Sequence, residues 1–352
     1  MEIELRWKNC TWIMALLAWA VFAFAVLIWS WHLMGEVWHK SYFIPILGYY
    51  VFVSICQSHY FKATMTPNWE GLLRQWVSLS SAVFIFIIHG WIMRHIIGVP
   101  EKLIMAGQFI FIVLGFFFFG WDDFLFKGQL SKWIKHDSLK ALFWYMIMWL
   151  VWYPLFAMDG GICSALGKFD GLTFNWLLGS FQWVIMMSMM IAITWNDFLE
   201  TVSFPSNYVR GILLFAFCLI AGFIIAYLCY SGINIFAPDL KASEKWHHVL
   251  YMGTYPLIPM ILFGVYSNHF NHIQDIKKKT LARTAFVVAM IVTGYLIFHY
   301  VIAPTNVFGE HHWVHHFDLA FNFTIAIMLL THHWFNGRLG FVTVRMREPG
   351  TS

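Results

Sequence analysis

Histidine, a common ligand of transition metals in proteins, is concentrated at a few places in this 352-residue chain. The densest is GEHHWVHHFD at residues 309–318, where four of the chain's 17 histidines stand within six positions beside two carboxylates. Imidazoles suit iron and copper, so His312, His315 and His316 are candidate metal ligands. The alternative is a solvated, proton-responsive loop, because imidazole titrates at roughly pH 6 to 7.

A second set of ionisable side chains recurs along the chain, each followed by an aromatic residue within two positions. We call this set the His/Asp column; its members are His59, Asp123, Asp197, His269 and His333. Successive members are 64, 74, 72 and 64 residues apart. Three imidazoles and two carboxylates suit Fe(II), Mn or Zn, so the column predicts a shared metal site if its members converge.

The alternative for the His/Asp column is interface chemistry, in which each side chain binds water or caps backbone groups beside an aromatic belt. An Asp at a helix C-terminus opposes the helix dipole and needs a nearby cation. Asp197 has no basic residue after it until Arg210, so a bound metal is one candidate for that cation.

Two further histidines stand inside apolar runs, in FIFIIHGW and GYLIFHYV. These are His89 and His299, and they occupy matching positions near the ends of two apolar segments. A buried imidazole needs a partner, so the two histidines are candidate axial ligands of a haem. The cofactor predicted from all these residues is a metal ion (iron or copper) or haem b.

The composition determines which solvent surrounds these residues. Hydrophobic residues make up 60% of the chain and charged residues 11%, against roughly 25% charged residues in soluble domains. Aromatic residues reach 20%, and Trp and Tyr favour membrane interfaces. We therefore predict an all-α, polytopic membrane helix bundle. The expected partners are the lipid bilayer and other membrane subunits; a net charge of +4 does not indicate nucleic acid.

Apolar runs predict about ten transmembrane helices. Their ranges are 11–32, 42–61, 76–96, 103–124, 140–158, 174–196, 210–232, 247–268, 283–302 and 315–335. Pro256 and Pro259 interrupt the eighth. Only six of the 22 Lys and Arg residues fall on the side away from the termini, so the positive-inside rule predicts cytoplasmic N- and C-termini. The expected location is a bacterial inner membrane.

The spacing of the His/Asp column also predicts an internal repeat. Each member ends an even-numbered helix, which makes five consecutive helical hairpins within a single integral membrane domain, 1–352. The hairpins cover approximately 8–62, 74–127, 139–200, 208–273 and 281–338. Several odd-numbered helices finish with His or an aromatic residue followed by proline, as at His89 to Pro100 and His299 to Pro304.

Three functions are consistent with these residues. The first is a membrane metalloprotein that is redox-active, either an oxidoreductase or a factor that handles haem, copper or iron. The second is a transporter of a small solute or metal ion, since transporters are often built from repeats. The third is a non-catalytic structural subunit of a membrane complex. If the chain is an enzyme, its residues favour a membrane-bound, metal-dependent oxidoreductase.

Overall fold

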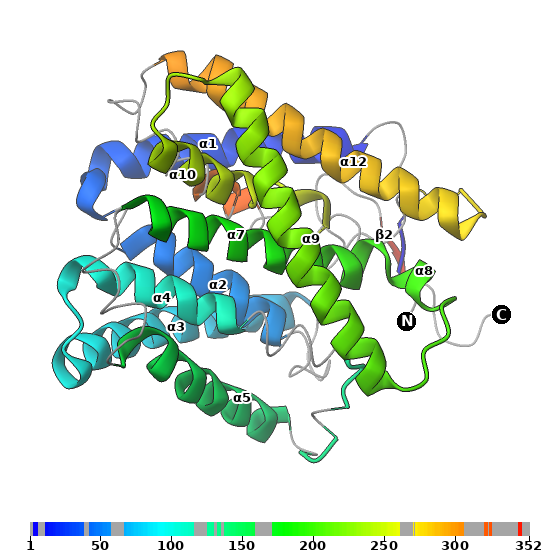
Figure 1. Cartoon of the computed structure of the whole chain (residues 1–352), viewed down its shortest axis with the longest axis horizontal. Helices are drawn as coiled ribbons and strands as arrows, with labels where there is room; N and C mark the ends of the chain where they lie inside the picture. The colour runs from blue at the N-terminus through cyan, green and yellow to red at the C-terminus, as the bar shows by residue number, and fades with distance from the viewer. Residues whose placement is uncertain are drawn as a thin grey trace.

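The computed structural model describes residues 3–5, 11–38, 42–57, 67–115, 125–129, 132–134, 137–158, 171–260, 270, 272–305, 320–322, 324–325 and 344–346. Most of these residues are helical, and most of the helices run from one side of the molecule to the other, left to right in Figure 1. The helices are α1 (Thr11–Trp38), α2 (Ile44–Gln57), α3 (Pro67–Ile92), α4 (Glu101–Gly115), α5 (Asp137–Trp152), α7 (Gly171–Met189), α8 (Asn196–Leu199), α9 (Asn207–Phe236), α10 (Ala242–Met252) and α12 (Ile276–Ile297).

Four of these helices continue into a turn of π-helix. The turns are η2 (Met93–Ile97) after α3, η4 (Tyr153–Ala157) after α5, η5 (Met190–Thr194) after α7 and η6 (Phe298–Ile302) after α12, which leads into the 3-10 turn η7 (Ala303–Thr305). Turns of this kind occur often at functional sites. Pro100 follows η2 closely, Pro154 lies within η4 and Pro304 lies within η7, so these helices end where proline removes a backbone donor.

Short strands join the two ends of the chain. β1 (Ile3–Leu5) pairs antiparallel with β2 (Val344–Met346), with Ile3 opposite Met346. Since the strands come from opposite ends of the chain, their pairing holds both ends on one side of the bundle. Figure 1 shows β2 on the same side as α8.

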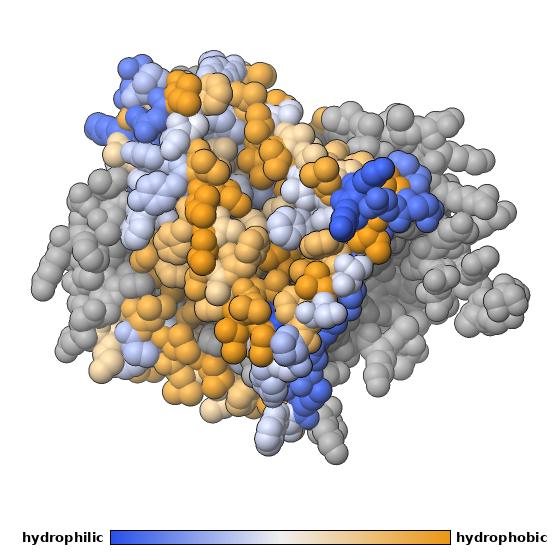
Figure 2. All heavy atoms as spheres, turned by 45° about the vertical axis from the view of Figure 1, so that its right-hand side comes forward, coloured by the Kyte–Doolittle hydropathy of each residue, from blue (hydrophilic) through white to orange (hydrophobic). Residues whose placement is uncertain are grey.

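Four helical segments are long and apolar enough to cross a membrane: Gln75–Ile97, Asn175–Thr194, Asn207–Phe236 and Ile276–Thr305. A helix satisfies all its central backbone groups internally, which a segment in lipid requires. Figure 2 shows the matching surface, a broad apolar band with hydrophilic residues gathered beyond its edges. The protein is therefore a helical membrane protein.

The described helices agree in position with the apolar runs. Each of the first nine predicted ranges overlaps a helix, while only 320–322 and 324–325 of the last range are described as helical. α2, α4 and α10 have 14, 15 and 11 residues, too short by themselves for a membrane span. The count of ten spans and the five hairpins stay predictions.

α7 lies at the centre of the bundle. Of its span, 72% is buried, against 17 to 28% for the other three spans. α9 crosses it closely, because a Cβ on Gly222 would lie 2.6 Å from the backbone of Val184. Met186, Met187 and Met190 are all buried in this core, as expected of flexible side chains that fill gaps between packed helices.

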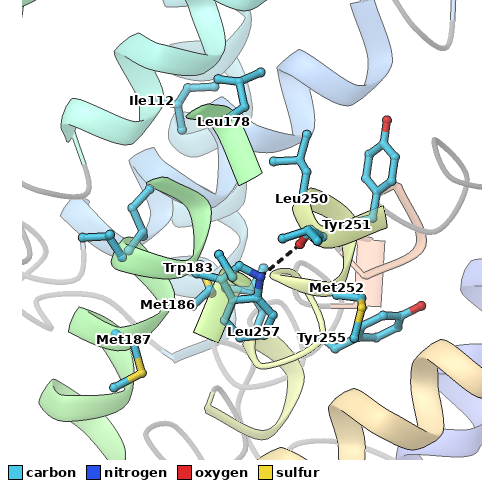
Figure 3. Packing of buried hydrophobic residues seen from close by; sticks show 14 of the residues in the cluster. Ile112, Leu178, Trp183, Met186, Met187, Leu250, Tyr251, Met252, Tyr255 and Leu257 are labelled. Carbon is cyan, nitrogen blue, oxygen red and sulfur yellow. Dashed lines mark hydrogen bonds between the residues drawn. The ribbon is translucent and has the colours of Figure 1, made fainter. Parts of the chain in front are cut away.

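The helix that begins as α10 is interrupted close to Pro256, where the proline predicts a break. α10 ends at Met252, residues 253–256 form turns, and the helix resumes over 257–260. Side chains of α7 bind the backbone carbonyls here: Trp183 Nε1 donates to Val249 O at 3.0 Å (Figure 3), and Gln182 Nε2 donates to Gly253 O at 3.3 Å. Such donors from a neighbouring helix make a broken helix tolerable within a membrane.

Candidate functional site

The structure describes three of the residues singled out from the sequence: His89, His299 and Asp197. The others lie outside the described residues, namely His59, Asp123, His269, His312, His315, His316 and His333. The shared metal site of the His/Asp column and the metal site of the 309–318 segment therefore stay predictions. Among the described residues, no group of three or more His, Cys, Asp or Glu side chains is placed to hold a metal ion.

Asp197 forms ion pairs with α12. It lies in the first turn of α8, where Lys279 Nζ donates to its Oδ2 at 2.6 Å and Arg283 Nη1 lies 3.6 Å from the same oxygen. The Lys279 hydrogen bond lowers the pKa of the Asp197 carboxyl, against a smaller opposing effect of burial, and the charges of Lys279 and Arg283 lower it further. The cation that Asp197 needs thus comes from α12, 82 residues away in sequence.

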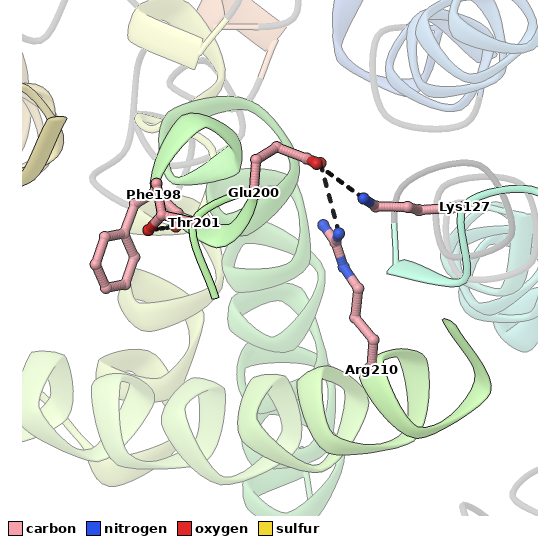
Figure 4. Close-up of polar contacts among 5 residues, drawn as sticks. All are labelled: Lys127, Phe198, Glu200, Thr201 and Arg210. Atoms are coloured by element: carbon pink, nitrogen blue, oxygen red, sulfur yellow. Dashed lines mark hydrogen bonds and ion pairs between the residues drawn. The ribbon is translucent and has the colours of Figure 1, made fainter. Parts of the chain in front are cut away.

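Glu200, just after α8, forms a second ion pair group (Figure 4). Lys127 Nζ donates to Glu200 Oε2 at 2.9 Å, and Arg210 Nη1 lies 3.5 Å from Glu200 Oε1. Arg210 belongs to the first turn of α9 and its side chain is 4% exposed. Since Asp197 and Glu200 bind side chains of three other segments, α8 ties those segments together on one side of the bundle.

His89 is fully buried in α3 within a cluster of aromatic rings. Its Nδ1 lies 2.6 Å from the hydroxyl of Tyr49 on α2. Its ring centroid lies 4.3 Å from that of Phe111, 4.7 Å from Trp149 and 5.2 Å from Trp152. Its Nε2 is shielded from solvent and has no hydrogen-bond partner among the described residues. The sequence predicted that this imidazole needs a partner, and the structure supplies one for one nitrogen only.

His299 lies in η6 and groups with His248 of α10. The two ring centroids are 6.0 Å apart. Tyr295, one helical turn before His299, stacks on the His299 ring with the planes at 6° and the centroids 5.6 Å apart. The Tyr295 hydroxyl lies 3.2 Å from His248 Nδ1. Spacing of four residues puts Tyr295 and His299 on one face of the helix, and that face meets the buried His248.

The two histidines predicted to clamp a haem are therefore in separate groups. His89 contacts α2, α4 and α5, and it makes no ring contact with His299. His248, which was not among the candidate ligands predicted from the sequence, is the imidazole nearest to His299 among the described residues. A sequence signal did exist, since the pair His247-His248 opens the predicted eighth span just as His299 closes the ninth.

The loop between α9 and α10 helps to position His248. Lys245 lies one turn before His248 on α10, and its ammonium donates to Asn234 Oδ1 at 2.7 Å and to Pro238 O at 2.9 Å. The Glu244 side chain accepts from the backbone N–H of Lys241 and caps the start of α10. The start of α10, and with it His248, is thus held against the end of α9.

No protein-family model, no curated protein and no solved structure matches this chain.

Proposed function

We propose that this chain is a multi-pass membrane metalloprotein with a redox-active ion, copper or iron, bound between His248 and His299. The observation that carries the proposal is the 6.0 Å separation of the two imidazole centroids. An imidazole nitrogen binds such a metal at about 2.0 Å, so two rings that share one ion have centroids roughly 5 to 6.4 Å apart. The observed separation lies inside this range.

Tyr295 supports the assignment in two ways. Metal-bound histidines commonly hydrogen-bond a second group through the nitrogen that does not bind the ion. The Tyr295 hydroxyl occupies that position at His248 Nδ1, so Nε2 would face the metal. Its ring also orients His299 by stacking. Because Tyr295 contacts both imidazoles, the group favours a small ion over a haem b, whose porphyrin would need a slot between them.

The pairing of the chain ends and the distribution of basic residues support an orientation of the protein in the membrane. The β1–β2 pairing fits an even number of membrane crossings, and Lys127, Lys279 and Arg283 lie on the side of α8. By the positive-inside rule we infer cytoplasmic termini and a metal group near the opposite surface, in what we expect to be a bacterial inner membrane. An oxidoreductase, or a factor that delivers metal to one, is the activity that fits this placement.

The test is metal analysis of protein purified in detergent. We expect stoichiometric copper or iron in the wild type, no Soret band, and loss of most of the metal in His248→Ala and in His299→Ala. His247→Ala is the matched control, because His247 stands on the same helix with its ring near Tyr251 instead. The proposal fails if the wild type is metal-free, or if all three variants keep the same metal content.

Transport is the second candidate, and the broken helix favours it. Discontinuous helices form the substrate sites of many transporters, and residues 253–256 interrupt one beside buried Gln182, Thr254 and Asn322. Asn322 Nδ2 donates to Thr254 Oγ1 at 2.8 Å. A transporter would accumulate solute in proteoliposomes, and Pro256→Ala would slow that uptake. A metalloprotein without transport activity would show neither effect.

A further inference from the structure

The His89 group has a polar atom that the metal proposal does not use. Imidazole is neutral here, because a charged ring enclosed by aromatic side chains would lose its hydration without an opposing charge. A neutral imidazole carries one proton, and the hydrogen bonds of the ring decide which nitrogen holds it. The contact between Tyr49 and His89 Nδ1 is therefore informative.

Tyr49 fixes the tautomer of His89. Tyr49 is fully buried, and in the part of the chain that the structure describes its hydroxyl has no other hydrogen-bond partner. Donation to His89 Nδ1 satisfies the proton of this hydroxyl. That nitrogen is then the acceptor, and the imidazole proton is on Nε2. A nitrogen that carries a proton has no lone pair for iron, so this arrangement does not suit His89 as a haem ligand.

The result is a buried N–H donor that has no acceptor in the described part of the chain. Buried polar groups are paired in nearly all proteins, so an orphan of this kind marks a missing partner. The indole of Trp152 in the ring cluster cannot accept this proton, because an indole nitrogen only donates, and its Nε1 already donates to Gly107 O at 2.8 Å. The partner that fits the Nε2 proton is an oxygen acceptor.

The side chains around His89 indicate the shape and polarity of the ligand that carries this oxygen. Phe111, Trp149 and Trp152 pack directly on the His89 ring at centroid distances of 4.3 to 5.2 Å. A ligand that replaced part of this packing would meet aromatic faces, which suit a flat, apolar molecule. Trp149 is only partly buried, and it lies on α5 beside Met146 and Leu150, whose side chains are exposed on the apolar surface. A ligand dissolved in the bilayer would reach His89 by displacing the Trp149 ring.

We propose that His89 Nε2 binds a carbonyl oxygen of a membrane quinone, in a site walled by Phe111, Trp149 and Trp152 and held in its tautomer by Tyr49. A quinone combines a flat ring, carbonyl acceptors and solubility in lipid. The proposal deepens the proposed function, and only its relevance to redox chemistry rests on that function. Binding itself depends on the His89 group alone.

The test is equilibrium binding of decylubiquinone to the full chain in phosphatidylcholine nanodiscs, followed by quenching of Trp fluorescence. We expect saturable binding to the wild type and at least tenfold weaker binding to His89→Phe, which keeps an aromatic ring and removes the N–H. His89→Gln, whose amide restores a donor, should recover part of the affinity. His95→Phe, an exposed site outside the cluster, should bind as the wild type does.

Two further measurements separate the possible outcomes. The infrared carbonyl band of the bound quinone should shift to lower frequency in the wild type and not in His89→Phe. Removal of metal by a chelator should leave quinone binding unchanged. A wild type that is purified without metal and still binds quinone would contradict the proposed function and not this site. Absence of saturable binding, or equal affinity in His89→Phe with the fold intact by thermal unfolding, would overturn the quinone site.

Discussion

Lys279 Nζ lies 2.6 Å from Asp197 Oδ2, although 82 residues separate them in sequence. The contact joins α8, at the end of the central α7–η5 segment, to the first turns of α12. Arg283, one turn further along α12, lies 3.6 Å from the same oxygen, and its side chain is 7% exposed. A carboxylate with two cations beside it has the arrangement of a structural ion pair.

Replacing Asp197 by Asn should destabilise the protein by about 1 kcal/mol, the upper end for ion pairs that are partly exposed. The physical reason is that buried Arg283 loses a carboxylate while the amide still accepts a hydrogen bond from Lys279. Thermal unfolding in detergent at pH 7 measures the change. Glu101→Gln, which breaks the exposed Arg94–Glu101 pair, is the control and should have a smaller effect. Equal effects would show that Arg283 does not depend on Asp197.

The stabilisation by Asp197 should depend on pH in one direction. Its folded pKa lies below the ordinary value of 3.8, chiefly because of the Lys279 hydrogen bond. Because the folded pKa is lowered, the contribution of ionised Asp197 to the free energy of unfolding is fully present above pH 3.8. It is lost as the pH falls through the folded pKa. The difference in melting temperature between wild type and Asp197→Asn should thus be constant from neutral pH to mildly acidic pH and shrink below that value. A difference that grows on acidification would contradict this ion pair.

Two glycines of α9 should respond in opposite directions to the same substitution. Gly222→Ala puts a Cβ 2.6 Å from the Val184 backbone, so α9 must move away from α7, at a cost of about 1 to 3 kcal/mol. Gly232→Ala meets no atom within 4 Å and should be neutral or stabilise the helix by up to about 1 kcal/mol. Thermal unfolding of the two variants compares them directly. A similar loss in both would mean that helix crossing at Gly222 is not close.

Some of this arrangement follows from local patterns in the sequence. Apolar runs predict where most of the helices lie, because each run supplies the side chains that lipid or a packed core requires. Pro256 predicts the break after α10, since proline lacks the donor that a continuous helix uses. The spacing of Tyr295 and His299 places both on one helical face.

The ion pairs and the histidine groups could not be predicted in the same way. Asp197 has no basic residue after it in sequence until Arg210, whereas Lys279 and Arg283, the cations beside it, lie on another helix. His89 and His299 have similar local sequences, and their different partners, Tyr49 and His248, come from different helix contacts.

The sequence by itself determined that the chain is a helical membrane protein and which residues could do chemistry in it. Both follow from side-chain type and from periods of a few residues, which depend on the chain alone. Only the tertiary structure decided that His248 faces His299 and that Tyr49 holds His89. These contacts join segments 40 or more residues apart. They depend on which helix faces pack together, and a local sequence pattern does not determine that packing.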